Sequence, residues 1–251
     1  MRTRPLLAAF LVYAAWMLAT WFYEGRIETL LRPDAAADRA VYAFVANILI
    51  GTLGALSVLA LILRTGAGDR ATAGLAPWRR ALASVAVGFA AGFSLYSLQG
   101  GPIDRPIVVV NAFAQVLVVS IAEVAVCWAL VAGTIAAMFR TGISRMAVAA
   151  VVASLLFGVY HFAHSAPFNT LPMVALLTGV GLITSFFFLV SRDLYGTIVF
   201  HNWLGVFGVV QALSAQEKLD SLAQPQLPVL VMAGIALLAL LAADGLLLRR
   251  A

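Results

Sequence analysis

The feature that most constrains this chain is the recurrence of long apolar runs with few charges inside them. Hydrophobic residues make up 63% of its 251 residues and charged residues only 11%, whereas a soluble domain is nearer half apolar and a quarter charged. A helix of about 20 apolar residues is long enough to cross a bilayer. The sequence therefore predicts an all-α, polytopic integral membrane protein with about eight transmembrane helices, at roughly 5–22, 41–63, 81–98, 107–138, 146–163, 171–190, 194–212 and 227–248.

The basic residues are distributed unevenly over the connections between these runs. If the N-terminus is cytoplasmic, the inner segments carry eleven Lys and Arg residues and the outer segments carry five. Because inner loops are enriched in Lys and Arg, we expect a multi-pass protein of the cell membrane with both termini in the cytoplasm. The basic and apolar N-terminus also resembles a signal peptide, but its run is longer than usual and lacks a clear cleavage site, so we expect an uncleaved first span.

Glu123 is the single charged residue within the apolar stretch 116–136. A carboxylate at that depth is costly unless it has a partner or a chemical role. It is either a structural acid bonded to a neighbouring helix or part of a functional site.

Histidines occur in two other apolar runs. His161 and His164 end the fifth run and share one helical face, and His201, followed by Asn202, lies in the seventh. His164 also fits an interfacial position at a helix end. One Glu and two deep His residues on three helices suit the activation of a water molecule, although proton relays in transporters use the same residue types.

Other features predict packing or partners. Gly88 and Gly92 form a GxxxG pattern that predicts close packing of the third span. Asn111 and Gln115 precede Glu123 on the same helix and either hold helices together or extend a polar groove. The arginines stand at the ends of apolar runs and do not form a basic stripe with aromatics, so no nucleic-acid partner is expected. The single cysteine, Cys127, excludes an internal disulfide.

Three short motifs resemble those of the CPBP family, the CAAX proteases and bacteriocin-processing enzymes. The segment SIAEVAVCWA around Glu123 is similar to the family pattern P-I-A-E-E-x-x-x-R-G. Phe157 and His161 match F-x-x-x-H, and His201 stands where H-x-x-x-N/D begins. The resemblance implies a CPBP-like core at 107–212, with about three N-terminal spans in 1–106 and one C-terminal span in 213–251.

The resemblance implies a glutamate-type intramembrane endopeptidase with Glu123, His161 and His201 as catalytic residues. Asn202, Phe157 and His164 are the expected supporting residues. The implied partners are membrane lipids and a peptide or membrane-protein substrate, which could be lipidated. No cofactor is expected; if a zinc ion takes part, Glu123, His161 and His201 would hold it.

The first and third motifs are incomplete. Val124 replaces the second glutamate, Trp128 the arginine, and Gly205 the Asn or Asp of the third motif. These departures favour an alternative, a catalytically inactive CPBP-like membrane protein with an immunity role or a peptide- or lipid-binding role. A proton-coupled transporter is a further alternative.

Overall fold

A computed structural model describes residues 3–29, 32, 34–138 and 143–251, and within them the chain is helical without a strand. The described residues include eight helices long and apolar enough to cross a membrane, which confirms the predicted class. Their bounds agree with the sequence prediction to within a few residues. They are Thr3–Gly25, Ala36–Arg64, Trp78–Leu98, Pro106–Met138, Arg145–Ala163, Leu171–Ser191, Leu194–Ala215 and Leu227–Leu248.

Several spans combine an α-helix with a stretch of wider π-helix or tighter 3₁₀-helix. Such irregular stretches often mark functional positions in helices, and two of them adjoin Glu123 and His161. The elements in chain order are α1 (Thr3–Thr20), η1 (Trp21–Gly25), α2 (Ala36–Tyr42), η2 (Ala43–Gly54), α3 (Ala55–Arg64), α4 (Trp78–Leu98), α5 (Pro106–Glu123), η3 (Val124–Ala132), α6 (Gly133–Met138), α7 (Ile143–Tyr160), η4 (His161–Ala163), α8 (Leu171–Ser191), α9 (Leu194–Ala215), η5 (Leu219–Leu222), α10 (Leu227–Ala243) and η6 (Asp244–Leu248).

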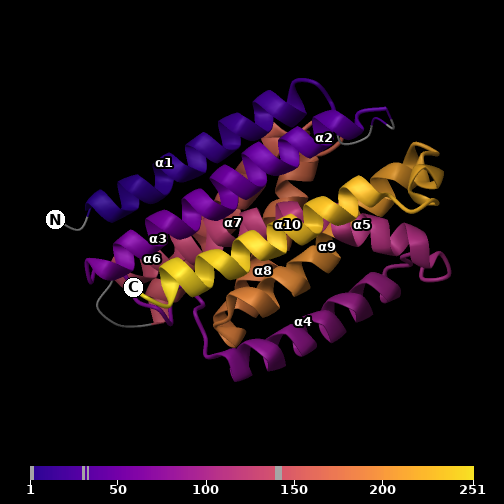
Figure 1. Cartoon of the computed structure of the whole chain (residues 1–251). Helices are drawn as coiled ribbons and strands as arrows, with labels where there is room; N and C mark the ends of the chain where they lie inside the picture. The colour runs from indigo at the N-terminus through magenta and orange to yellow at the C-terminus, as the bar shows by residue number, and fades with distance from the viewer. Residues whose placement is uncertain (1–2, 30–31, 33, 139–142) are drawn as a thin grey trace.

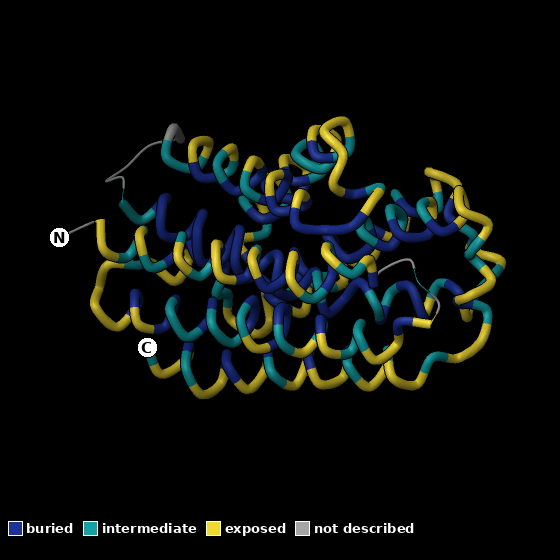
Figure 2. Tube along the Cα trace, turned by 90° about the horizontal axis from the view of Figure 1, so that it is seen from above, coloured by how far each residue is buried: buried dark blue, intermediate teal, exposed yellow. Residues whose placement is uncertain are grey.

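The fourth span, formed by α5, η3 and α6, is the core of the bundle. In its 18-residue apolar stretch 94% of the residues are buried, against 22% to 56% in the other spans. Figure 2 shows buried segments inside and exposed ones around the outside. The span is 33 residues long, and helices of the first, second, fifth, seventh and eighth spans pack against it. Glu123, at the junction of α5 and η3, therefore lies inside the bundle and away from lipid.

The glycines of α4 permit the close packing that the GxxxG pattern predicts. A Cβ atom on Gly88 would lie 2.4 Å from the carbonyl oxygen of Gly196, and one on Gly92 would lie 2.8 Å from Cβ of Trp203. Both contacts are on α9, the helix that carries His201. The glycines thus let α4 pack closely against the face of α9 that carries Gly196 and Trp203.

The bundle has two distinct ends. The first turn of α1 and the end of η6 lie at one end (Figure 1), as expected for an even number of spans. At that end Arg249 forms an ion pair with Asp244 at 2.9 Å, and Arg70 donates to the Leu248 carbonyl. We call it the terminal end. The other is the distal end, which includes the described residues of the connections 26–35, 99–105, 164–170 and 216–226.

Candidate functional site

Glu123 lies between two histidines from other spans. Its Oε2 atom is 3.0 Å from Nε2 of His201 on α9, and its Oε1 atom is 3.9 Å from Nε2 of His161 at the end of the fifth span. All three side chains are at least nine-tenths buried. The structure therefore brings together the three residues that the sequence singled out, and their catalytic role stays a prediction.

The hydrogen bonds of His201 identify its tautomer. Thr184 of α8 donates its hydroxyl hydrogen to the Val180 carbonyl at 3.0 Å, and its oxygen lies 2.8 Å from Nδ1 of His201. Because the hydroxyl has one hydrogen, its oxygen accepts from Nδ1–H. Nε2 of His201 then faces Oε2 of Glu123 across a single hydrogen bond of 3.0 Å.

His161 is oriented by its own helix. Its Nδ1–H donates to the carbonyl of Phe157, one turn earlier, at 2.8 Å. A neutral His161 therefore presents the lone pair of Nε2 to Glu123. The Phe157 ring contacts His161 and His201 with centroid distances of 4.7 and 5.0 Å. Phe157 thus packs edge-to-face against both imidazoles.

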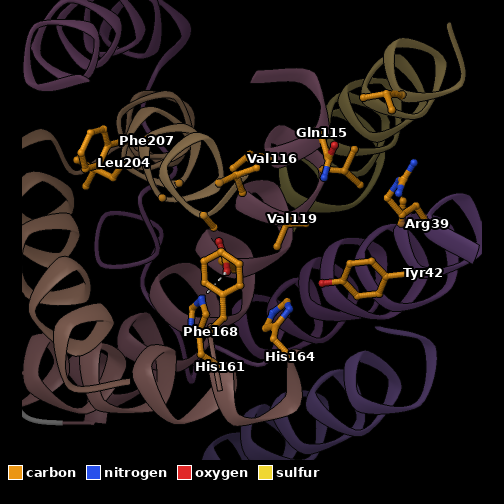
Figure 3. A pocket seen from close by; sticks show the side chains of 18 of the residues that line it. Arg39, Tyr42, Gln115, Val116, Val119, His161, His164, Phe168, Leu204 and Phe207 are labelled. Atoms are coloured by element: carbon orange, nitrogen blue, oxygen red, sulfur yellow. Dashed lines mark ion pairs between the residues drawn. The ribbon is translucent and has the colours of Figure 1, made fainter. Parts of the chain in front are cut away.

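These groups line the inner part of a cavity of about 1070 Å³. Figure 3 shows Arg39, Tyr42, Gln115, His161 and His164 around it. Gln115 therefore extends a polar groove, one of the two roles open to it. The wall formed by α8, α9 and α10 is largely apolar and includes Met173, Leu176, Leu177, Val180, Leu204, Phe207 and Met232.

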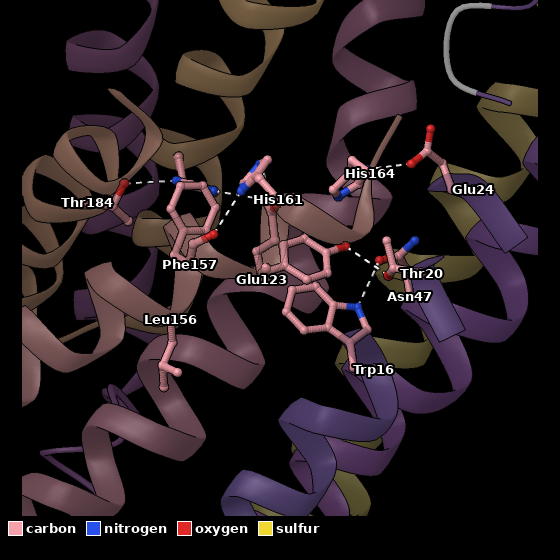
Figure 4. Close-up of polar contacts among 12 residues, drawn as sticks. Trp16, Thr20, Glu24, Asn47, Glu123, Leu156, Phe157, His161, His164 and Thr184 are labelled. Atoms are coloured by element: carbon pink, nitrogen blue, oxygen red, sulfur yellow. Dashed lines mark hydrogen bonds and ion pairs between the residues drawn. The ribbon is translucent and has the colours of Figure 1, made fainter. Parts of the chain in front are cut away.

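A second carboxylate–imidazole pair adjoins the first and was missed by the sequence prediction. Nδ1 of His164 is 3.0 Å from Oε2 of Glu24. The same Oε2 accepts from the backbone N–H of Ser165, and Oε1 accepts from the Ser165 hydroxyl. The His164 ring stacks on His161 with centroids 5.2 Å apart. Figure 4 shows Thr184, His161, His164 and Glu24 following one another across the bundle. His164 lines the cavity, whereas Glu24 lies behind it.

Gly25 makes this second pair geometrically feasible. A Cβ atom at position 25 would lie 2.1 Å from the carbonyl oxygen of Ala163, closer than atoms can approach. The absent side chain lets η1 contact η4, and Glu24 then reaches Ser165. The sequence signal for this site was a Glu-Gly pair at the end of an apolar run.

The remaining polar residues hold helices together. Asn202 is fully buried, but its Nδ2 donates to the Phe113 carbonyl of α5 at 3.2 Å and it does not line the cavity. Asn202, which was predicted to support the site, therefore does not contact the cavity. Asn111 donates to the carbonyls of Leu222 and Gln224, so it fixes the connection before α10.

The three residues that differ from the family motifs each have a defined place in the packing of the bundle. Trp128 donates from Nε1 to Ser185 at 2.8 Å, and its ring lies 5.3 Å from that of His201. Val124 is fully buried in the apolar core. A Cβ atom on Gly205 would lie 2.7 Å from Cγ1 of Val116, so a larger residue there would push α9 away from α5.

The arrangement does not match a metal centre. Among the residues in the described ranges, no three His, Cys, Asp or Glu side chains are placed to hold a metal ion. Nε2 of His201 is hydrogen-bonded directly to Glu123, whereas zinc needs the lone pairs of its ligands at about 2.0–2.2 Å. We therefore derive no step through a metal.

No family model, curated protein or solved structure matches the chain.

Proposed function

We propose that the protein is a CPBP-like intramembrane endopeptidase that hydrolyses a peptide bond with Glu123, His161 and His201. The observation that supports it best is the convergence of these three side chains on one cavity between apolar helices. The proposed core is 107–212. The proposed location is the cell membrane, with both termini cytoplasmic, because nine of the basic residues in the described ranges lie at the terminal end and five at the distal end.

The gap between Glu123 and His161 is suited to the reacting water. Their facing atoms, Oε1 and Nε2, are 3.9 Å apart, too far for a direct hydrogen bond. A water that donates one hydrogen bond of about 2.8 Å to each would span roughly 4 Å. Both atoms are acceptors when Glu123 is ionised and His161 is neutral, so the water keeps a lone pair for attack.

The proposed reaction begins when this water attacks the carbonyl carbon of the scissile bond. Glu123 takes one proton from the water, and the new C–O bond gives a tetrahedral intermediate with a negative oxygen. Glu123 is now neutral and attracts the proton on Nε2 of His201 less, so His201 can donate to that oxygen. The C–N bond then breaks, Glu123 returns the proton to the leaving nitrogen, and the products are an acid and an amine.

The proposed substrate is a peptide or a membrane-protein segment. The cavity volume of about 1070 Å³ lies at the upper limit of small-molecule pockets, about 300–1,000 Å³. Its apolar wall accommodates hydrophobic side chains or a lipid modification, with membrane lipids around the bundle. No nucleic acid or cofactor enters the proposal.

Glu123→Gln tests the proposal with little change in shape. Purified protein in lipid vesicles would be incubated with hydrophobic reporter peptides, and new peptide ends would be identified by mass spectrometry. We expect cleavage to fall by about 100-fold or more, because general-base catalysis contributes about 10²–10⁴-fold. Glu28→Gln, at an exposed position, is the matched control and should cleave normally. Full activity of Glu123→Gln would contradict the proposal.

The replaced motif residues favour a second candidate, a non-catalytic protein that binds a peptide or lipidated partner in the same cavity. Trp128 is bonded to Ser185 where the family pattern has an arginine, and Gly205 supplies no donor. For this candidate, the wild-type protein would bind reporter peptides without cleaving them. Glu123→Gln would leave the protein's role in the cell intact.

A further inference from the structure

Of the two ends of the bundle, the described lining residues of the cavity reach only the distal one. Its lining includes Gln99, Phe168 and Gln226, which lie in three distal-end connections, and Arg39 near the distal start of α2. Among the described residues of the terminal-end connections, 65–77 and 192–193, none lines it. A molecule from the aqueous phase that reaches Glu123 through this cavity therefore enters from the distal end.

Polar side chains mark this route. Four glutamines line the cavity, namely Gln99, Gln115, Gln211 and Gln226. Gln115 and Glu123 are both on α5, eight residues apart, which is about 12 Å at 1.5 Å per residue. Amide side chains along the entrance can hold water molecules on the way to Glu123. Hydrolysis needs this supply, because each hydrolysed bond consumes one water.

The two ends differ strongly in charge. Among the described residues, the terminal end carries nine Arg residues and three acids, whereas the distal end carries five basic residues and seven acids. At the distal end Arg32 pairs with Asp34 at 3.4 Å, and Arg105 pairs with Asp220 at 2.5 Å. The net positive charge of the described residues is thus concentrated at the end away from the distal end of the cavity. Positively charged ends of membrane proteins stay in the cytoplasm.

From these two asymmetries we infer that the cavity is an extracytoplasmic chamber, which takes hydrophobic peptide segments from the outer face of the membrane. That the occupant is a peptide rests on the proposed function, whereas the side of entry rests on charge and cavity shape alone. A protein segment confined to the cytosol, with or without a lipid modification, is then not a substrate. The substrate class is instead exported peptides and the outer ends of membrane-spanning segments.

Single-cysteine labelling in intact cells tests the side of entry. The one native cysteine, Cys127, is buried and would be replaced by Ala. Into that background we would introduce Gln99→Cys at the opening, Gly208→Cys and Ala212→Cys in the cavity wall, and Ala67→Cys in the exposed α3–α4 connection. A charged, membrane-impermeant maleimide is the probe, applied before and after lysis.

We expect the opening and wall cysteines to react in intact cells and Ala67→Cys to react only after lysis. The reverse pattern would place the opening in the cytosol and overturn the inference. Reaction of Gln99→Cys in intact cells, with both wall cysteines unreactive before and after lysis, would also overturn it, because the cavity would then be closed at this end. None of these results depends on cleavage by the wild-type protein or by Glu123→Gln, so failure of the peptidase proposal remains distinguishable.

Discussion

At the scale of single residues, Thr184 accepts the hydrogen bond from Nδ1–H of His201. Thr184→Val keeps the side-chain shape but removes the acceptor of His201 Nδ1–H, which is 2.8 Å away. An unsatisfied buried donor costs about 1–3 kcal/mol, so we expect cleavage to fall by about tenfold or more. Thr178→Val is the control, since Thr178 bonds its own helix at the Val174 carbonyl and has no contact with His201. Equal rates for both variants would exclude this role of Thr184.

Glu24 supports the second imidazole and the turn that follows it. In Glu24→Ala, the Ser165 N–H and hydroxyl and the His164 ring lose a buried carboxylate. Leaving a buried donor such as the Ser165 N–H without its acceptor costs about 1–3 kcal/mol, so the unfolding temperature in detergent should fall clearly. Glu28→Ala, four residues away and exposed, should change it little. An unchanged unfolding temperature for Glu24→Ala would show that the pair does not stabilise the fold.

The sequence identified part of the candidate site for a physical reason. A charged or imidazole side chain inside an apolar run is conspicuous, so Glu123, His161 and His201 could be selected without a structure. Glu24 lies at the end of its run, where polar residues are common, so the Glu-Gly pair alone was too weak a signal to set it apart. Neighbours on a helix point about 100° apart, so the Asn202 side chain faces α5 while His201 faces Glu123, and a supporting role for Asn202 stays a prediction.

At the scale of helices, the contact between α4 and α9 depends on small residues. Gly88→Ala would place a Cβ atom 2.4 Å from the Gly196 carbonyl oxygen, and such overpacking costs about 1–3 kcal/mol. We expect reduced thermal stability, and reduced cleavage because α9 carries His201. Gly179→Ala on α8 has nothing within 4 Å and should be neutral or slightly stabilising. Equal stability of the two variants would contradict the packing argument.

Span positions were predictable from sequence, but the packing order of the spans was not. Membrane length and apolar composition suffice to locate each run, since lipid cannot satisfy a polar backbone. In lipid, however, residues facing the bilayer and residues facing protein are both apolar. The hydrophobic pattern therefore did not show that α5 and η3 form the core, with 94% of their span's apolar stretch buried. Only side-chain packing distinguishes that span from its neighbours.

At the scale of the whole molecule, the catalytic proposal requires the cavity to be the route of the substrate. Gly208 lines the cavity, and a Cβ atom there would have nothing within 4 Å. Gly208→Trp should therefore place a large ring in the route without disturbing the helices, and we expect kcat/KM to fall by about tenfold or more through narrowed access. Gly234→Trp is the matched control, because Gly234 is exposed on α10, has equally open space and does not line the cavity.

The two tryptophan variants separate access from folding. Both add the same side chain to a transmembrane helix at an open glycine, so their unfolding temperatures should be similar. Peptide cleavage should be lost selectively in Gly208→Trp, and the charged maleimide should label Ala212→Cys more slowly when Gly208→Trp is also present. If cleavage were equal in the two variants, the substrate would reach Glu123 by another path. The distal cavity would then be a solvent-filled or lipid-filled space and not the entrance to the site.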